Sequence, residues 1–248
     1  MIFSGNSFGN ERIVRHALGK FTLIELIVVV SVIAILASLL LPALNKSRMT
    51  AKKITCTSML KIYLTGAHMY ASDFNGSWVP IWRRDDGVAW QNNPMWRTYI
   101  GADYAPDLNS SILPVYLLCP DSRGAINARS LKAWGYPSVP PRGNYGSAQE
   151  SYGVTYNDVW STTRVFRLEQ LKRSSSSMAW GDGLDWLLYS NNLPDYFVGG
   201  ENAPGNGRVA YRHTNTLNVG MFDGHVENFG YLYLHDPANF KKLTEGFY

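Results

Sequence analysis

The chain has few cysteines and few charged residues. Cys56 and Cys119 are the only thiols among 248 residues, which excludes a small scaffold held by many disulfides. Both lie after the longest apolar run, and they form one disulfide if that part of the chain faces an oxidising compartment; two separate buried thiols are the alternative. Only 17% of residues are charged and 13% are aromatic, a composition that favours a folded body over disorder.

The sequence also lacks the patterns of nucleic-acid binding and of catalysis. Its net charge of +4 is small and spread along the chain, which argues against nucleic acid as a main partner. It contains no Ser-His-Asp order, no glycine-rich loop that would hold a phosphate, and no legible pair of catalytic carboxylates. We therefore predict no nucleic-acid partner, no enzymatic activity and no cofactor.

One long apolar run is present, from Phe21 to Pro42, and it is long enough to cross a bilayer. It carries a carboxylate, Glu25, near its start. A charged side chain in hydrocarbon costs about 3 kcal/mol on insertion scales, so such a residue usually marks a function. A plain signal anchor with an accidental glutamate is the alternative interpretation.

The residues before this run set its orientation. Arg12, Arg15 and Lys20 outnumber the single acid Glu11, and positive charge beside an apolar segment holds that side in the cytoplasm. We therefore expect a single-pass protein of the cytoplasmic (inner) membrane, in contact with membrane lipid. The chain after Leu44 is predicted to lie in the periplasm or another extracytoplasmic space.

The segment 19–26, Gly-Lys-Phe-Thr-Leu-Ile-Glu-Leu, resembles the processing site of type IV prepilins and type II secretion pseudopilins. In that family a prepilin peptidase cuts before the phenylalanine and methylates the new amino group. With Phe21 first, Glu25 is the fifth mature residue, which is the hallmark of the family. Pro42 is then the twenty-second residue, where proline is also common.

The residues at the cut depart from the family in one respect. The family usually has glycine directly before the cut, whereas here Lys20 stands in that place and Gly19 comes one residue earlier. A cut after Gly19 would move Glu25 out of its register. We take Gly19, Lys20 and Phe21 as the processing site and Phe21 as the first mature residue.

The resemblance implies a pilin-like α+β fold. A long N-terminal helix, membrane-spanning in its first half, would pack on an antiparallel β-sheet domain with loop-rich insertions. The implied division is a leader at 1–20, a transmembrane helix at 21–44, an extended soluble helix at 45–76 and an extracytoplasmic domain at 77–248.

The resemblance also implies a function. The chain would be a structural subunit that prepilin peptidase processes. It would assemble with other pilin or pseudopilin subunits, on an inner-membrane assembly platform, into a type II secretion-like or type IV pilus-like filament.

The chemistry of Glu25 supports such an assembly. After cleavage the free amine of Phe21 lies roughly one helical turn away. In a packed filament the amine of an incoming subunit can pair with Glu25 of its neighbour, which favours one axial register because an unpaired carboxylate in lipid is costly. Pro42 removes a backbone donor and is expected to bend or loosen the helix, so that neighbouring helices fit.

Residues 45–72 are predicted to continue the helix. Apolar residues recur at intervals of three and four and form a stripe that we expect to pack on a β-sheet. The stripe consists of Cys56, Met59, Leu60, Ile62, Tyr63, Met69 and Tyr70. The segment Asp-Phe-Asn-Gly at 73–76 is a helix stop, because asparagine and glycine tolerate left-handed backbone.

Four tryptophans, Trp78, Trp82, Trp90 and Trp96, lie in an irregular stretch that follows the helix. Clustered tryptophans can form a sugar-binding platform, but more often they fill the core of a loop-rich domain, which we prefer. The platform keeps an alternative function open: a membrane-anchored extracytoplasmic binding module for glycans or exported substrates.

Near the C-terminus, two strand-like runs at 217–222 and 225–229 flank Asp223-Gly224. This pattern predicts a tight hairpin with positive φ at both turn residues. Nine residues separate His213 from Asp223-Gly224, a spacing that resembles the H-X9-DG signature at the C-terminal end of many prepilin-like proteins.

The same region contains weak candidates for metal ligands. His213, Asp223 and His225 have suitable donor atoms, and Asp182 is a further candidate. The alternative is a hairpin in which Asp223 makes the turn and the histidines cap backbone groups. We prefer the alternative and predict no metal.

Overall fold

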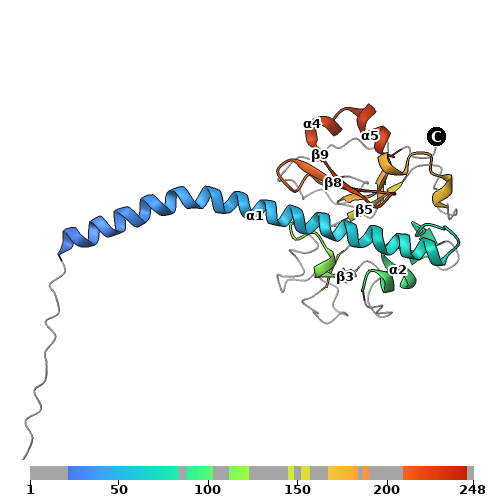
Figure 1. Ribbon diagram of the computed structural model, residues 1–248, viewed down its shortest axis with the longest axis horizontal. Helices are drawn as coiled ribbons and strands as arrows, with labels where there is room; N and C mark the ends of the chain where they lie inside the picture. Colours follow the sequence, from blue (N-terminus) through green and yellow to red (C-terminus); the bar gives the residue numbers. More distant parts are fainter. Residues whose placement is uncertain are drawn as a thin grey trace, which may run out of the picture. The chain divides into compact units, whose positions relative to one another are not determined.

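The computed structural model describes residues 22–83, 88–102, 112–122, 145–147, 152–156, 167–183, 187–189 and 209–244. The chain divides into two compact units, Met1–Lys46 and Ser47–Tyr248. The predicted processing site, Gly19, Lys20 and Phe21, lies outside the described residues. Figure 1 shows the elements of both units along the chain.

Helix α1, Leu23–Asp73, begins with a reciprocal cap at its first turn. Thr22 Oγ1 accepts a hydrogen bond from the backbone N–H of Glu25 at 3.4 Å, and Glu25 Oε2 accepts one from the N–H of Thr22 at 2.8 Å. This is the capping box that a Thr-x-x-Glu sequence favours. The helix continues through Pro42 without interruption.

The first part of α1 exposes its apolar side chains. From 23 to 46 every side chain is exposed, and the helix is long and apolar enough to span a membrane by length and composition. Its two serines satisfy their hydroxyls internally: Ser31 donates to the carbonyl of Ile27 and Ser38 to that of Ile35, both at 2.7 Å. Such bonds suit a hydrocarbon environment because no water is needed to complete them.

The second part of α1 belongs to the second unit, and from Cys56 on one side of it is buried in the core of that unit. The helix ends at Asp73, where Asn75 and Gly76 have φ of 53° and 76°. The N–H of Gly76 returns to the carbonyl of Ala71 at 2.8 Å. The helix stop read from Asn75 and Gly76 is therefore confirmed, by the left-handed geometry that these residue types tolerate.

A five-stranded sheet has the order β7-β5-β6-β8-β9. Its strands are β5 (Tyr152–Tyr156), β6 (Met178–Asp182), β7 (Leu187–Tyr189), β8 (Thr216–Met221) and β9 (Val226–Gly230). Strands β5, β6, β8 and β9 pair antiparallel, whereas β7 is parallel to β5. The class is α+β, as predicted, and the prediction of an antiparallel sheet holds for all pairs except this edge pair.

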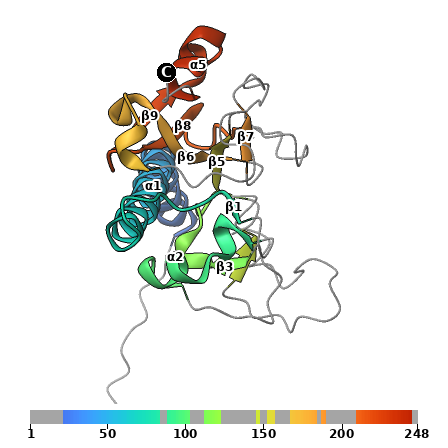
Figure 2. The same ribbon diagram turned by 90° about the vertical axis from the view of Figure 1, so that its right-hand side faces the viewer.

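Helices cover both faces of the sheet (Figure 2). Helix α1 packs on one face, where a Cβ atom on Gly220 would lie 2.9 Å from Leu64 Cδ1. The other face is covered by α4 (Tyr231–Leu234) and α5 (Pro237–Thr244), which bury Phe240 and Leu243 against β8. Strands β6 and β8 are consequently buried on both sides.

The C-terminal helices were not expected. Asp236 accepts a hydrogen bond from the N–H of Ala238 at 2.9 Å, and Pro237 occupies the first helical position. An aspartate followed by proline is a readable helix start, so the sequence did contain a signal for α5.

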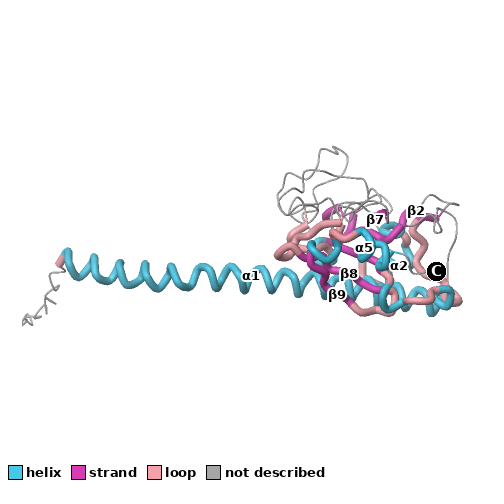
Figure 3. Tube along the Cα trace, turned by 90° about the horizontal axis from the view of Figure 1, so that it is seen from above, coloured by secondary structure: helices cyan, strands magenta, loops and turns pink. Residues whose placement is uncertain are grey.

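The remaining elements of the second unit, within the ranges that the structure describes, are short (Figure 3). They are β1 (Trp82–Arg83), β2 (Val88–Ala89), η1 (Trp90–Asn92), α2 (Pro94–Tyr99), β3 (Ile112–Pro114), η2 (Val115–Leu117), β4 (Tyr145–Ser147), η5 (Leu168–Gln170) and η6 (Ser174–Ser176). Strand β1 pairs with β2 and β3 with β4, both antiparallel.

Candidate functional site

The first candidate feature is the carboxylate at the start of α1. Thr22 donates two hydrogen bonds to Glu25, from its backbone N–H at 2.8 Å and from its hydroxyl at 2.7 Å. Both bonds end on Oε2, and among the residues that the structure describes no hydrogen bond reaches Oε1. Glu25 is exposed together with the apolar residues around it. One of its two oxygens is thus used in the cap, on a side chain that is exposed.

The second candidate feature is the H-X9-DG segment, whose turn differs from the one expected. The N–H of Met221 donates to the carbonyl of His225 at 2.8 Å, and this hydrogen bond encloses a loop of three residues, 222–224, between β8 and β9. Gly224 has a φ of 95°, but Asp223 has no positive φ. The prediction of positive φ at both residues is wrong, because a three-residue connection needs only one left-handed residue where a two-residue turn needs two.

The two ends of this motif lie at opposite ends of β8. His213 precedes the strand and Asp223 follows it, and six strand residues span about 20 Å. His213, Asp223 and His225, the weak candidates for metal ligands, therefore cannot bind one ion together. Asp223 Oδ1 instead accepts hydrogen bonds from the backbone N–H and the Nδ1 of His225, at 3.1 and 2.6 Å.

The Asp-Gly turn connects β8 and β9 with two other elements. The N–H of Asp223 donates to the carbonyl of Ser174 at 3.3 Å, and that of Phe222 donates to the carbonyl of Ser177 at 3.1 Å. A Cβ atom on Gly224 would lie 3.4 Å from Nε2 of His68 on α1. Asp223 and Gly224 therefore make the turn, as in the alternative preferred from the sequence, but within the described part of the chain the ring nitrogens of the two histidines lie near carboxylates and a sulfur atom and do not cap backbone groups.

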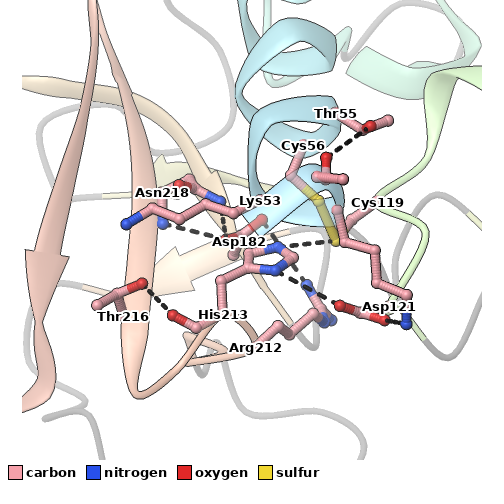
Figure 4. A network of polar contacts seen from close by, with 12 residues as sticks. Lys53, Thr55, Cys56, Cys119, Asp121, Asp182, Arg212, His213, Thr216 and Asn218 are labelled. Carbon is pink, nitrogen blue, oxygen red and sulfur yellow. Dashed lines mark hydrogen bonds and ion pairs between the residues drawn. A yellow bond between two sulfur atoms is a disulfide. The ribbon is translucent and has the colours of Figure 1, made fainter. Parts of the chain in front are cut away.

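The histidine of the motif belongs to a different group (Figure 4). Cys56 of α1 and Cys119 form a disulfide, and Nε2 of His213 lies 3.3 Å from Sγ of Cys119. Asp182, the last residue of β6, completes the group. Among the described residues this is the one set of cysteine, histidine and acidic side chains that could hold a metal ion, with one potential ligand atom from each residue within 4.8 Å of the others. All four residues are buried.

Polar contacts surround the aspartate of this group. Asp182 Oδ2 accepts hydrogen bonds from the backbone N–H and the side-chain amide of Asn218, both at 3.0 Å. Asp182 Oδ1 lies 4.0 Å from Nη1 of the buried Arg212. A buried carboxylate needs such partners, because an uncompensated charge in the interior is strongly destabilising.

A second carboxylate lies close to the histidine. Nδ1 of His213 lies 3.5 Å from Oδ2 of Asp121, which also forms an ion pair with Lys52 of α1. Burial lowers the pKa of His213 to about 4; Asp121 opposes this shift and the nearby Arg212 adds to it. At neutral pH the imidazole is therefore uncharged, which is the form that binds metals.

The members of this group come from positions 56, 119, 182 and 213, each in a different part of the fold. From the sequence, the cysteine pair was a disulfide candidate, and His213 and Asp182 were weak ligand candidates. Nothing in the sequence placed the four residues together. No short-range spacing connects four such distant positions, so only the fold reveals the group.

The tryptophans show what the aromatic residues do. Trp78, Trp90 and Trp96 are buried, together with Trp180 of β6. Tyr63 of α1 lies among them, with its ring centroid 5.1 Å from that of Trp96. The core interpretation is confirmed for these tryptophans, and they cannot form a surface for sugars.

The side chain of Trp82, the fourth tryptophan of the stretch, is not among those that the structure describes.

Comparisons with protein-family models, with curated proteins and with solved structures found no match. The α+β class rests on the described residues, and the prepilin resemblance rests on sequence motifs.

Proposed function

We propose that this chain is a membrane-anchored structural subunit of the type IV prepilin and type II pseudopilin class. Prepilin peptidase would cut before Phe21, and the mature chain would assemble with other subunits, through an inner-membrane platform, into a filament. The second unit would be extracytoplasmic. The observation that carries the proposal is an acid, Glu25, at the start of a helix whose first part, residues 23–46, leaves every apolar side chain exposed in the single chain.

An exposed apolar helix of this length requires a cover. Burying the side chain of a leucine, isoleucine or valine is favourable by about 1.5–3 kcal/mol relative to leaving it in water. Lipid can cover the helix in the precursor, and the helices of other subunits can cover it in a filament. Both environments are available to a prepilin, because its first helical segment passes from the membrane into the fibre core.

Glu25 favours the filament over the membrane as the surroundings of this helix. In lipid its carboxylate is costly even with the Thr22 cap, because two hydrogen bonds on Oε2 do not neutralise the charge. The new amine of Phe21 in a neighbouring subunit is a cation that could reach Oε1. Pairing the two charges stabilises the assembled state over the isolated subunit, and it does so in only one axial register.

The second part of α1 supports the same function. Residues Leu60, Tyr63 and Leu64 are fully buried in the second unit, and the Cys56–Cys119 disulfide fixes the helix to the segment after η2. The helix that would enter the fibre core through residues 23–46 thus continues along the chain into a segment that is buried in the folded body. A body held in this way remains attached when the helix is incorporated into a filament.

A crosslinking experiment tests the proposal. The full chain, with a photocrosslinking amino acid in place of the exposed Leu36, is expressed in membranes that contain a prepilin peptidase and assembly platform. We expect a ladder of crosslinked subunits for the unaltered chain. Glu25→Gln keeps an N3 residue that can cap the helix but removes the charge, so the ladder should be lost while membrane insertion persists.

Thr22→Ala is the matched control. It removes the threonine hydroxyl from the cap but keeps the carboxylate, so the ladder should remain. An undiminished ladder for Glu25→Gln, or equal loss of the ladder for both variants, contradicts the assembly role. Resistance to carbonate extraction verifies that each variant is inserted in the membrane.

A further inference from the structure

We propose that Cys56, Cys119, Asp182 and His213 form a tetrahedral zinc site in the chain whose two cysteines are reduced. The site is independent of the proposed filament function. Its class of ligand is a divalent transition metal that prefers mixed sulfur, nitrogen and oxygen donors, of which Zn²⁺ is the most common in proteins. The disulfide and the metal site exclude each other, since both use the same two sulfur atoms.

The geometry fits such an ion. Zinc bonds of about 2.0–2.3 Å place the corners of a tetrahedron about 3.3–3.8 Å apart. Nε2 of His213 already lies 3.3 Å from Sγ of Cys119, and one donor atom from each of the four residues lies within 4.8 Å of the others. To bind the ion, the two sulfur atoms must separate from bonding distance to about 3.7 Å, and any donor pair near the 4.8 Å limit must move about 1 Å closer.

The surrounding residues match those of a zinc site. Metal-binding histidines usually direct their second nitrogen to a carboxylate, which fixes the ring and raises its basicity. Here Nε2 of His213 faces the sulfur while Nδ1 faces Oδ2 of Asp121 at 3.5 Å. Asn218 orients Asp182 with two hydrogen bonds to Oδ2, both at 3.0 Å.

The charges also balance. Two thiolates and one carboxylate bound to Zn²⁺ leave one net negative charge, because the imidazole is neutral. Arg212, whose side chain is only 2% exposed, lies 4.0 Å from Oδ1 of Asp182 and supplies the compensating positive charge. A buried site with its charge compensated avoids the large desolvation penalty of an unpaired ion.

The chemistry of loading needs no oxidant or reductant in a newly made chain, whose cysteines are thiols. Zn²⁺ binds and two protons leave the thiols. In the disulfide form, a phosphine first reduces the S–S bond: the two sulfur atoms gain two electrons and two protons, and the phosphine takes oxygen from water to become a phosphine oxide. Metal binding then follows as before.

The test uses the full chain in detergent micelles, reduced with a phosphine under argon and supplied with Zn²⁺ or Co²⁺. We expect about one metal ion per chain by elemental mass spectrometry. Cobalt should give intense visible bands of tetrahedral coordination together with thiolate-to-cobalt charge-transfer bands. Wild-type protein left in its disulfide form should take up no metal at this site.

Variants identify the ligands. Cys119→Ser, His213→Gln and Asp182→Asn should each weaken cobalt binding at least about tenfold, and Asp121→Asn should weaken it by about 10–100-fold. His225→Ala is the control, since His225 lies on the β8–β9 turn outside the group, and it should bind cobalt as the wild type does.

Several results would overturn the proposal. These are a reduced and folded protein that takes up no metal, a cobalt spectrum without thiolate bands, and equal loss of binding in His225→Ala. Reduced protein that unfolds and is not refolded by Zn²⁺ also overturns it, because a structural zinc site stabilises the folded chain. Near-ultraviolet circular dichroism of the buried tryptophans reports the folded state.

Discussion

Gly66 of α1 and Ile100, the residue after α2, approach so closely that a Cβ atom on Gly66 would lie 2.5 Å from Cγ2 of Ile100. Real Cβ contacts are not this short, so a larger residue would force the helix and the α2 segment apart. At Gly66, α1 is thus in close contact with the segment that ends α2.

We therefore expect Gly66→Ala to destabilise the second unit. Alanine gains about 1 kcal/mol of helix propensity over glycine. Overpacking costs about 1–3 kcal/mol, and at so short a contact this cost exceeds the gain in helix propensity. Urea unfolding followed by tryptophan fluorescence measures the change. Gly230→Ala is the control, because no atom lies within 4 Å of the added Cβ. Equal stability of Gly66→Ala and the wild type would contradict the packing argument.

Gly224 provides a test of the β8–β9 turn. Its φ of 95° is strained for any residue with a Cβ, so Gly224→Ala should lower the free energy of unfolding by about 1–2 kcal/mol. Gly224→Asn should cost less, since asparagine tolerates left-handed backbone better. The same unfolding measurement compares the two variants. Equal losses for alanine and asparagine would show that contact with His68, and not backbone strain, dominates.

Local signals in the sequence predicted part of this fold. The apolar run predicted the first part of α1, and Asn75 and Gly76 predicted its end. Asp223-Gly224 predicted the turn between β8 and β9. Each of these features depends on neighbouring residues, so short sequence patterns contain the information.

Other features were not predictable from local patterns. Asp182 and His213 meet the disulfide only because β6, β8 and α1 pack together, and the parallel pairing of β7 with β5 is likewise a tertiary outcome. The cap between Thr22 and Glu25 was predictable from the local Thr-x-x-Glu pattern. It was not predicted, because Glu25 was interpreted only as a charge that serves assembly.

The disulfide should contribute strongly to stability. Cys56 and Cys119 are 63 residues apart, and closing a loop of this length stabilises the fold by about 4 kcal/mol in the chain-entropy model. The double variant Cys56→Ala/Cys119→Ala should therefore lose about 2–4 kcal/mol of unfolding free energy in metal-free buffer. Unfolding of the oxidised wild type and the variant in parallel measures this loss, and a change below about 1 kcal/mol would contradict it.

The buried imidazole predicts a pH dependence of the disulfide form. His213 has a pKa of about 4 in the folded chain and about 6.5 when unfolded, so below pH 6.5 the unfolded state binds the proton first. The contribution of the neutral His213 to the free energy of unfolding is fully present above pH 6.5, and it is lost as the pH falls to about 4. The loss amounts to at most about 3 kcal/mol.

Urea unfolding at about pH 7.5 and about pH 4.5, on either side of the unfolded-state pKa, measures this dependence. Carboxylates also titrate in this range, so the comparison is with His213→Gln, which should show a smaller drop in stability between the two pH values. Identical drops for the variant and the wild type would mean that His213 is not the group responsible.

The working chain is expected to begin at Phe21, with a free end that pairs with Glu25 of a neighbouring subunit. Mass spectrometry of the protein isolated from its native membranes tests this expectation most directly. We predict an N-terminal peptide that starts at Phe21 and carries one methyl group on its amine. A functional protein that retains residues 1–20 would contradict it.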